Sequence, residues 1–232
     1  MNTIEGIFFD LDGTLLNTAE DFVVTVNQML DDYKQQPMPA EHIRRNVSAG
    51  SRTLMKMAFS LTDGEMLEQR RNEFLSLYNQ HIQDQERSSS AQLYPGIKEL
   101  ISAIEERDII WGVITNKPRA YAEKLLEQQD LLKRTATLLC PDDANLPKPH
   151  PESLLRACQQ TRCAPEKSIY IGDHIRDIQA GKAAGMITVA AHYGYIADTD
   201  DPTQWSADLN INNISEFHHW LNRTDWAIAP RE

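Results

Sequence analysis

The strongest constraint on the fold is an alternation between short apolar runs and longer amphipathic segments along the chain. The apolar runs are continuously hydrophobic, as parallel strands buried on both faces are, and they cover residues 7–9, 109–115, 137–140, 168–172 and 187–191. Helix-length segments separate them, at about residues 96–107, 118–129, 151–161 and 174–185. Strands that alternate with helices predict βαβ units. We therefore expect an α/β fold with a Rossmann-like parallel sheet, which continues into a last strand at 209–211 and a helix at 214–221.

The interval from Thr18 to Gln92 breaks this alternation, because it contains helical patterns and no convincing strand. Apolar residues recur there at helical spacing in two stretches, Phe22-Val23-Val26-Met29-Leu30 and Phe74-Leu75-Tyr78-Ile82. A turn at Tyr94-Pro95-Gly96 closes the interval. We expect an inserted all-helical cap domain at residues 18–92 and a core domain made of residues 1–17 and 93–232.

The composition disfavours several classes of partner. The 232 residues include 23 Lys and Arg against 34 Asp and Glu, a net charge of −11, which disfavours nucleic acid and anionic membranes. No apolar stretch approaches the ~18 residues that a membrane span needs, and the first ten residues do not resemble an export signal. Three sparse cysteines do not suggest a disulfide framework. We expect a cytoplasmic protein that is a monomer or a small homo-oligomer.

Polar residues follow the predicted strands at the points where the strands end. In chain order these segments are Asp10-Leu11-Asp12-Gly13-Thr14, Thr115-Asn116-Lys117, Lys148-Pro149, and Gly172-Asp173 with Asp177. Ligands of open α/β sheets bind at the carboxyl ends of the strands. We therefore expect the four segments to meet at one edge of the sheet.

This set of side chains favours metal-assisted phosphoryl transfer. Asp10 and Asp12 straddle a tight turn that Gly13 permits, so both can face one point. Carboxylates and a phosphate dianion repel one another, by about 4 kcal/mol per pair at about 4 Å and an effective dielectric near 20. A bound Mg²⁺ removes that conflict. One Asp can then act as the nucleophile and a second as the general acid and base.

The four segments together resemble the motifs of the haloacid dehalogenase superfamily of phosphatases. Their matches, in order, are Asp10-x-Asp12-Gly13-Thr14, Thr115-Asn116, Lys148-Pro149 and Gly172-Asp173-x-x-x-Asp177. The helical block also lies where this superfamily carries one type of cap. The resemblance therefore covers the whole predicted core and implies roles for the matched positions.

By this resemblance, Asp10 is the nucleophile and a Mg²⁺ ligand. Asp12 is the general acid and base, and its backbone carbonyl also binds the metal. Gly13, Thr115 and Asn116 are phosphate-binding positions. Taken one at a time, these residues could instead be turn formers or a helix N-cap.

The remaining matches complete the implied site. Lys148 is the cation that pairs with the nucleophile and the phosphate, and Asp173 is a metal ligand. Asp177 is a metal ligand or supports one, with a purely structural place in the first turn of a helix as the alternative. His174 adjoins Asp173, but imidazole is a poor Mg²⁺ ligand, so we expect a structural role for it.

The presence of Asp12 favours phosphoryl transfer over carbon–halogen hydrolysis, because the dehalogenases of this superfamily lack that acid. The chain is similar to the phosphoglycolate phosphatase family, and its segments 140–142, 172–177 and 193–196 resemble the bacterial N-acetylmuramic acid 6-phosphate phosphatases of peptidoglycan recycling. This implies a Mg²⁺-dependent phosphomonoesterase that acts on a small phosphorylated metabolite through an aspartyl-phosphate. The alternatives are a sugar phosphomutase of the same fold and a non-catalytic phosphate-binding regulator.

Phosphoglycolate and N-acetylmuramic acid 6-phosphate both carry a carboxylate beyond the phosphate, and a carboxylate favours recognition by arginine. Arg45 and Arg52 lie on either side of a short stretch that includes Gly50 and Ser51, whose small side chains let the backbone approach a ligand. The corresponding cap loop of the family contacts the leaving group. We therefore expect Arg45, Gly50, Ser51 and Arg52 to select the substrate, with a solvated helix face as the alternative.

Overall fold

A six-stranded, all-parallel sheet forms the centre of the protein. The computed structural model describes residues 3–83, 89–223 and 227–228. In spatial order the strands are β6 (Leu138–Leu139), β5 (Ile110–Ile114), β2 (Gly6–Phe9), β7 (Ser168–Gly172), β8 (Ile187–Ala191) and β9 (Leu209–Ile211). The predicted α/β fold with a parallel sheet is confirmed, and β7, β8 and β9 have the predicted bounds.

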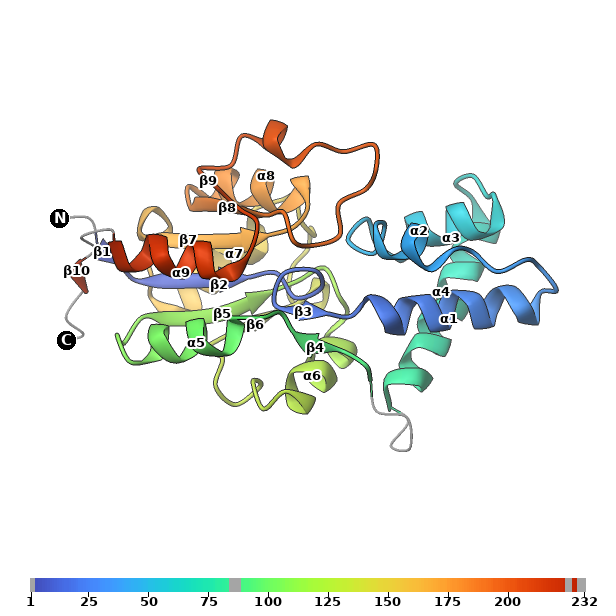
Figure 1. The fold of residues 1–232 in the computed structure, drawn as a ribbon, viewed down its shortest axis with the longest axis horizontal. Helices are drawn as coiled ribbons and strands as arrows, with labels where there is room; N and C mark the ends of the chain where they lie inside the picture. The colour runs from blue at the N-terminus through green and yellow to red at the C-terminus, as the bar shows by residue number, and fades with distance from the viewer. Residues whose placement is uncertain (1–2, 84–88, 224–226, 229–232) are drawn as a thin grey trace.

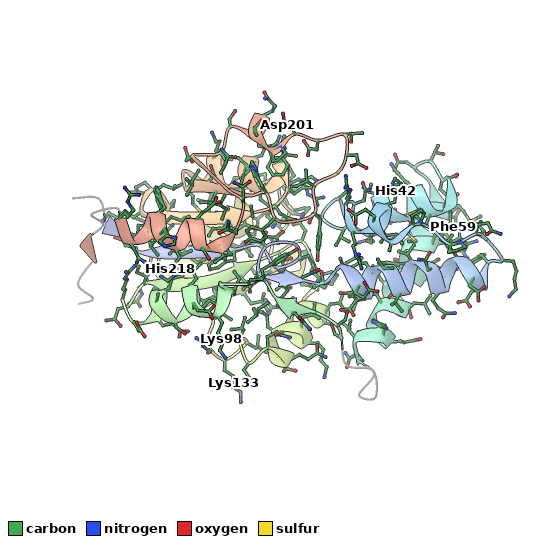
Figure 2. All side chains as sticks on the ribbon, viewed as in Figure 1. His42, Phe59, Lys98, Lys133, Asp201 and His218 are labelled. Carbon is green, nitrogen blue, oxygen red and sulfur yellow. The ribbon has the colours of Figure 1, made fainter. Side chains whose placement is uncertain are left out.

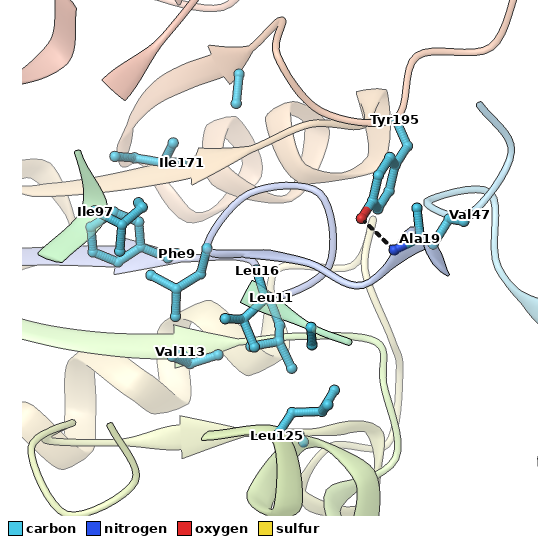
Figure 3. Close-up of a cluster of buried hydrophobic side chains, with 14 of the residues drawn as sticks. Phe9, Leu11, Leu16, Ala19, Val47, Ile97, Val113, Leu125, Ile171 and Tyr195 are labelled. Carbon is cyan, nitrogen blue, oxygen red and sulfur yellow. Dashed lines mark hydrogen bonds between the residues drawn. The ribbon is translucent and has the colours of Figure 1, made fainter. Parts of the chain in front are cut away.

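Helices cover both faces of the sheet. Because successive residues of a strand point to opposite sides, each strand contributes side chains to the hydrophobic clusters on both faces. Ile7 and Phe9 of β2 belong to the hydrophobic cluster that includes the buried faces of α5 (Ile97–Glu105), α6 (Arg119–Gln128) and α9 (Ile214–Arg223). Phe8 belongs to the cluster on the other face, under α7 (Glu152–Thr161) and α8 (Ile175–Ala184). Figure 3 shows Phe9, Ile97, Val113 and Ile171 within the first cluster.

Short elements complete the core. Strand β1 (Thr3–Ile4) pairs in parallel with β10 (Ala227–Ile228), near the two chain ends. Single 3₁₀ turns occur at Pro141–Asp143, Pro165–Lys167 and Pro202–Trp205. No helix in the described ranges is both long and apolar enough to cross a membrane.

Four helices project from the edge of the sheet toward which its strands point (Figure 1). They are α1 (Ala19–Asp32), α2 (Ala40–Arg44), α3 (Ser51–Phe59) and α4 (Glu65–Gln83). The rings of Phe22, Phe74 and Tyr78 join α1 to α4, with centroids 4.8–5.9 Å apart. In Figure 2, His42 and Phe59 lie on this projection, whereas Lys98 and Lys133 lie beside the sheet. The predicted helical insertion is confirmed.

An antiparallel pair that the sequence did not predict joins the two parts. β3 (Leu16–Asn17) pairs with β4 (Gln92–Leu93), so the chain leaves for the helical projection and returns from it at one place. Strands of two residues are too short to show an alternating pattern, which explains why this pair was missed. We propose the division into a core (1–17 and 93–232) and a cap (18–92) at this pair.

A buried carboxylate fastens the returning segment to the helical projection. Asp21 on α1 is fully buried, and it accepts hydrogen bonds from the hydroxyl of Ser89 and from the backbone N–H (3.0 Å) and hydroxyl (2.9 Å) of Ser90. His81 Nε2 on α4 lies 3.0 Å from the same carboxylate. One side chain therefore holds α1, α4 and the segment that leads into β4.

Replacing Asp21 with Ala should lower the free energy of unfolding by about 2–3 kcal/mol, because hydrogen bonds to a charged group are lost and buried donors lose their acceptor. Urea unfolding measures the change. Asp31→Ala, on the exposed part of the same helix, is the matched control and should change stability by less than about 0.5 kcal/mol. Equal effects of the two substitutions would contradict the structural role of Asp21.

Candidate functional site

Three buried carboxylates meet at the edge of the sheet where its strands have their C-terminal ends. Asp10 follows β2, Asp173 follows β7, and Asp177 lies in the first turn of α8. One oxygen of each carboxylate lies within 4.8 Å of the others, and each residue is at most 8% exposed. The neighbouring positions of β2 and β7 in the sheet bring these residues together, although more than 160 positions separate Asp10 from Asp173.

Lys148 is the cation at the centre of this cluster. Its Nζ lies 2.9 Å from Asp10 Oδ1 and donates hydrogen bonds to Asp177 Oδ1 (2.7 Å), the Tyr170 hydroxyl (2.7 Å) and the Ile114 carbonyl (3.1 Å). Burial opposes its charge, but the carboxylates of Asp10 and Asp177 outweigh burial and raise the pKa of Lys148. The lysine is therefore a fixed positive charge beside Asp10.

A single lysine does not balance three carboxylates. Burial raises the pKa of Asp10, although Lys148 opposes this effect, and the charge of Asp177 adds to it. Burial and the charges of Asp10 and Asp177 raise the pKa of Asp173 well above its ordinary value. The cluster thus carries an electrostatic cost that a cation would relieve.

The donor set fits a divalent, oxygen-seeking cation. Asp173 Oδ1 is buried and has no hydrogen-bond partner, whereas Oδ2 accepts from the hydroxyl of Ser48 and the backbone N–H of Tyr195, each at 2.7 Å. All the side-chain ligand atoms offered are carboxylate oxygens, which suit Mg²⁺. Asp10, Asp173 and Asp177 are therefore the residues that could hold the metal.

Two glycines let the backbone pack directly against Asp173. A Cβ at Gly13, which has φ +75°, would lie 1.9 Å from Asp173 Oδ2, and a Cβ at Gly194 would lie 2.2 Å from Asp173 Cβ. Both approaches are closer than any side chain permits. Gly13 thus serves the site by admitting Asp173 beside the first loop.

Asp12 has different surroundings from Asp10. Its carboxylate accepts hydrogen bonds from Lys117 Nζ (3.0 and 3.2 Å) and from the Thr18 hydroxyl (2.6 Å). The Lys117 ammonium also lies 4.8 Å and 4.4 Å from the ring centroids of Phe22 and Tyr78, on α1 and α4. Asp12 is therefore oriented by groups that depend on the helical projection as well as on the sheet.

The sequence did not indicate a role for Lys117. It directly follows Thr115 and Asn116, so its position at a strand end was apparent. Its pairing with Asp12 depends on tertiary structure that brings the β2 and β5 loops together beneath two aromatic rings. Local sequence carries no signal for such a contact.

Thr115 and Asn116 lie at the same edge and already have local partners. Asn116 Nδ2 donates to the Lys148 carbonyl (3.0 Å), and the Lys148 N–H donates to Asn116 Oδ1 (3.1 Å). Thr115 Oγ1 accepts from the N–H of Lys117 (3.1 Å). The Asn116 side chain thus fixes the loop that carries Lys148, and both residues line the cavity described next.

His174 has the structural role that we expected. Its ring Nδ1 accepts from the backbone N–H of Arg176 (3.1 Å), and the backbone N–H of His174 donates to Asp177 Oδ2 (3.1 Å), which caps α8. Burial and the charge of Arg176 lower the pKa of His174 to about 4, so the ring is neutral.

A cavity opens above Asp10 and Asp12. Its upper wall is largely apolar and comes from the helical projection and the start of α6: Phe22, Val47, Phe74, Leu75, Tyr78, Pro118 and Tyr121. Polar lining comes from Ser48, Gly50, Ser51, Lys117 and Arg176. The cavity thus joins the carboxylates of the core to a surface with aromatic groups.

Only two of the four residues that we expected to select the substrate line the cavity above Asp10. Gly50 and Ser51 line the cavity above Asp10, but Arg45 and Arg52 do not. Arg45 pairs with Glu41 and Asp198 and lines a separate cleft beside Tyr94 and Tyr193. Arg52 pairs with Asp63 and Glu68 on the outside of the projection.

Known proteins resemble this chain in sequence over most of its length. A model of the haloacid dehalogenase-like hydrolase family matches residues 7–191. The chain is 39% identical over 221 residues to an N-acetylmuramic acid 6-phosphate phosphatase of Pseudomonas aeruginosa, covering 95% of this chain and 96% of that protein. It is 38% identical over 205 residues to a phosphoglycolate phosphatase of Xanthomonas campestris, covering 88% and 90%.

A solved structure shares the fold. The crystal structure of a predicted phosphoglycolate phosphatase from Haemophilus somnus superimposes with a TM-score of 0.82 at 23% identity, covering 95% of this chain and 99% of that one. The similarity extends over the sheet and the helical projection together.

Asp173→Asn should stabilise the metal-free protein and remove its stabilisation by Mg²⁺. Asn lacks the buried negative charge that Asp10 and Asp177 repel, but it also provides a poorer metal ligand. Thermal unfolding in EDTA and in saturating Mg²⁺ measures both effects. A variant less stable than the parent in EDTA, or one that Mg²⁺ stabilises equally well, would contradict the proposed cation site.

Proposed function

The chain belongs to the haloacid dehalogenase-like hydrolases and is a phosphatase of that family, and from this premise we propose that it hydrolyses phosphate monoesters through a phosphorylated Asp10. The proposal rests on the convergence of Asp10, Asp12, Lys148 and Asp173 from three separate loops onto one edge of the sheet, where Asp10 and Asp12 line the cavity. A protein that only binds phosphate does not need a carboxylate nucleophile beside a carboxylate acid.

In the first half-reaction, an oxygen of Asp10 attacks the phosphorus and the bond between phosphorus and the leaving-group oxygen breaks. Asp12, held by Lys117 and Thr18, donates its proton to that oxygen. Lys148, 2.9 Å from Asp10, offsets negative charge on the transferring group. Thr115 lines the same cavity, and we propose that its side chain and the backbone of the turn at Gly13 donate hydrogen bonds to the phosphate.

In the second half-reaction, a water molecule attacks the phosphorus of the aspartyl-phosphate. Asp12 accepts a proton from this water, the bond between phosphorus and Asp10 breaks, and inorganic phosphate leaves. A Mg²⁺ bound by Asp10, Asp173 and Asp177, and by the backbone carbonyl of Asp12, would neutralise phosphate charge and position the phosphoryl group. Asp12 thus acts as the acid in the first step and as the base in the second, and it has regained its proton when phosphate leaves.

We propose N-acetylmuramic acid 6-phosphate as the preferred substrate and phosphoglycolate as the second candidate. The relative named for the first activity matches almost the whole chain at 39% identity. The cavity also offers the partly exposed side chains of Leu75, Pro118 and Tyr121 to a leaving group, and a pyranose ring covers such a surface better than a two-carbon acid does. This proposal connects the enzyme to peptidoglycan recycling.

Phosphate release from a panel of monoesters, with Mg²⁺ and with EDTA, tests the reaction class. We expect metal-dependent release, with N-acetylmuramic acid 6-phosphate ranked above phosphoglycolate and simple aryl phosphates. Isomerisation of a sugar phosphate without net release would indicate a phosphomutase instead. Absence of turnover on every ester in the presence of Mg²⁺ would favour a non-catalytic regulator.

Asp10→Asn should abolish turnover without unfolding the protein, because the amide has the same shape but is a poor nucleophile and metal ligand. Steady-state kinetics and circular dichroism measure the two properties. Activity above a few per cent of the parent in the purified variant would reject Asp10 as the nucleophile.

Asp12→Asn should lower kcat by about 10²- to 10⁴-fold, since proton transfer is lost in both half-reactions. The rate of Asp10 phosphorylation, measured in a single turnover, should fall less for p-nitrophenyl phosphate, whose leaving group departs without needing a proton. A kcat loss below tenfold on a sugar phosphate, or equal losses in the phosphorylation rate on both esters, would contradict the assignment of Asp12.

A further inference from the structure

Arg176 lies where the cavity, the helical projection and the carboxylate cluster meet. It is in the first turn of α8, next to Asp177, and its half-buried side chain lines the same cavity as Phe22 and Tyr78. Its Nη2 donates to the backbone carbonyl of Ser48, in the segment between α2 and α3. The same Ser48 donates its hydroxyl to Asp173. The guanidinium therefore borders the space beyond the phosphate position.

The cations near this cavity differ in how their charges are balanced. Lys117 pairs with Asp12, and Lys148 pairs with Asp10 and Asp177. Within the described ranges, no carboxylate forms an ion pair with Arg176, whose recorded side-chain partner is a neutral carbonyl. Arg176 is thus the cavity-lining cation with charge available for an anion on the substrate.

The chemistry of guanidinium suits a carboxylate at this point. Arginine presents five N–H donors, and a carboxylate can accept two of them side by side. A half-buried guanidinium without an anionic partner is costly, so a leaving group that lacks the carboxylate gains less from binding. The apolar wall supplies contact area for the leaving group but no charge.

We infer that Arg176 binds a carboxylate on the leaving group and so selects phosphate monoesters that carry a second anionic group. This inference rests on the proposed phosphatase function. It differs from the sequence-based expectation, which gave this selectivity to Arg45 and Arg52. Those two arginines are paired with carboxylates and lie outside the cavity above Asp10.

Two sugar phosphates that differ in the carboxylate provide the test. N-acetylmuramic acid 6-phosphate and N-acetylglucosamine 6-phosphate share the phosphate and the ring, but only the first carries the lactyl carboxylate. Arg176→Gln should lower kcat/KM for the first substrate by about 10- to 100-fold, chiefly through KM, as expected for a lost hydrogen bond between charged groups. The loss for the second substrate should be much smaller.

Matched variants separate this role from a structural one. Arg156→Gln alters an exposed arginine on α7 that pairs with Glu152, and it should leave kcat/KM unchanged for both sugar phosphates. Arg176→Lys should recover part of the preference, because it restores the charge without the paired donors. With the unaltered enzyme, free N-acetylmuramic acid should inhibit p-nitrophenyl phosphate hydrolysis more strongly than N-acetylglucosamine does.

Several outcomes would overturn the inference. Equal losses on both sugar phosphates would show that Arg176 only holds the Ser48 segment. Loss of the preference in Arg45→Gln or Arg52→Gln, with Arg176→Gln unaffected, would return the role to those residues. An unaltered enzyme that hydrolyses both esters equally would reject carboxylate selection but leave the phosphatase intact, whereas no turnover of any ester would reject the proposed function itself.

Discussion

The burial of three carboxylates beside one lysine is the constraint on which the rest of the site depends. Asp10, Asp173 and Asp177 each lose most of their contact with water, and Lys148 balances only part of their charge. Such an arrangement is unfavourable by itself, since repulsion and desolvation both raise the pKa of Asp173. A divalent cation bound there would complete the charge balance, because its two positive charges add to that of Lys148 against three carboxylates. We therefore infer that the electrostatic repulsion in the metal-free cluster favours binding of a cation.

The two aspartates of the loop after β2 have different side-chain partners, which fit them for different chemical roles. Asp10 faces the buried lysine and the carboxylate cluster, whereas Asp12 faces Lys117 and Thr18. Because Lys117 packs against rings of α1 and α4, the orientation of Asp12 depends on the helical projection being in place. The same helices supply the apolar wall of the cavity. Substrate contact and acid–base geometry are thus linked through one set of aromatic side chains.

The sequence predicts the parts of the site that depend on short segments and regular patterns. Continuous apolar runs predicted the parallel strands, and the residues after them included Asp10, Lys148 and Asp173, which the structure brings to one edge. Contacts across the fold were not predictable in this way. The pairing of Lys117 with Asp12 spans 105 positions, and that of Arg176 with Ser48 spans 128. Arg45 and Arg52 were chosen for their proximity to Gly50 in sequence, yet their side chains point to carboxylates outside the cavity.

In the proposed mechanism the phosphoryl group passes through a covalent bond to Asp10. Rapid acid quenching of the enzyme during turnover, followed by mass spectrometry of its peptides, tests this step. We expect a phosphate adduct on the peptide that contains Asp10, localised to that residue and absent when substrate is omitted. A phosphate adduct on another residue, or none at any quench time during productive turnover, would contradict it.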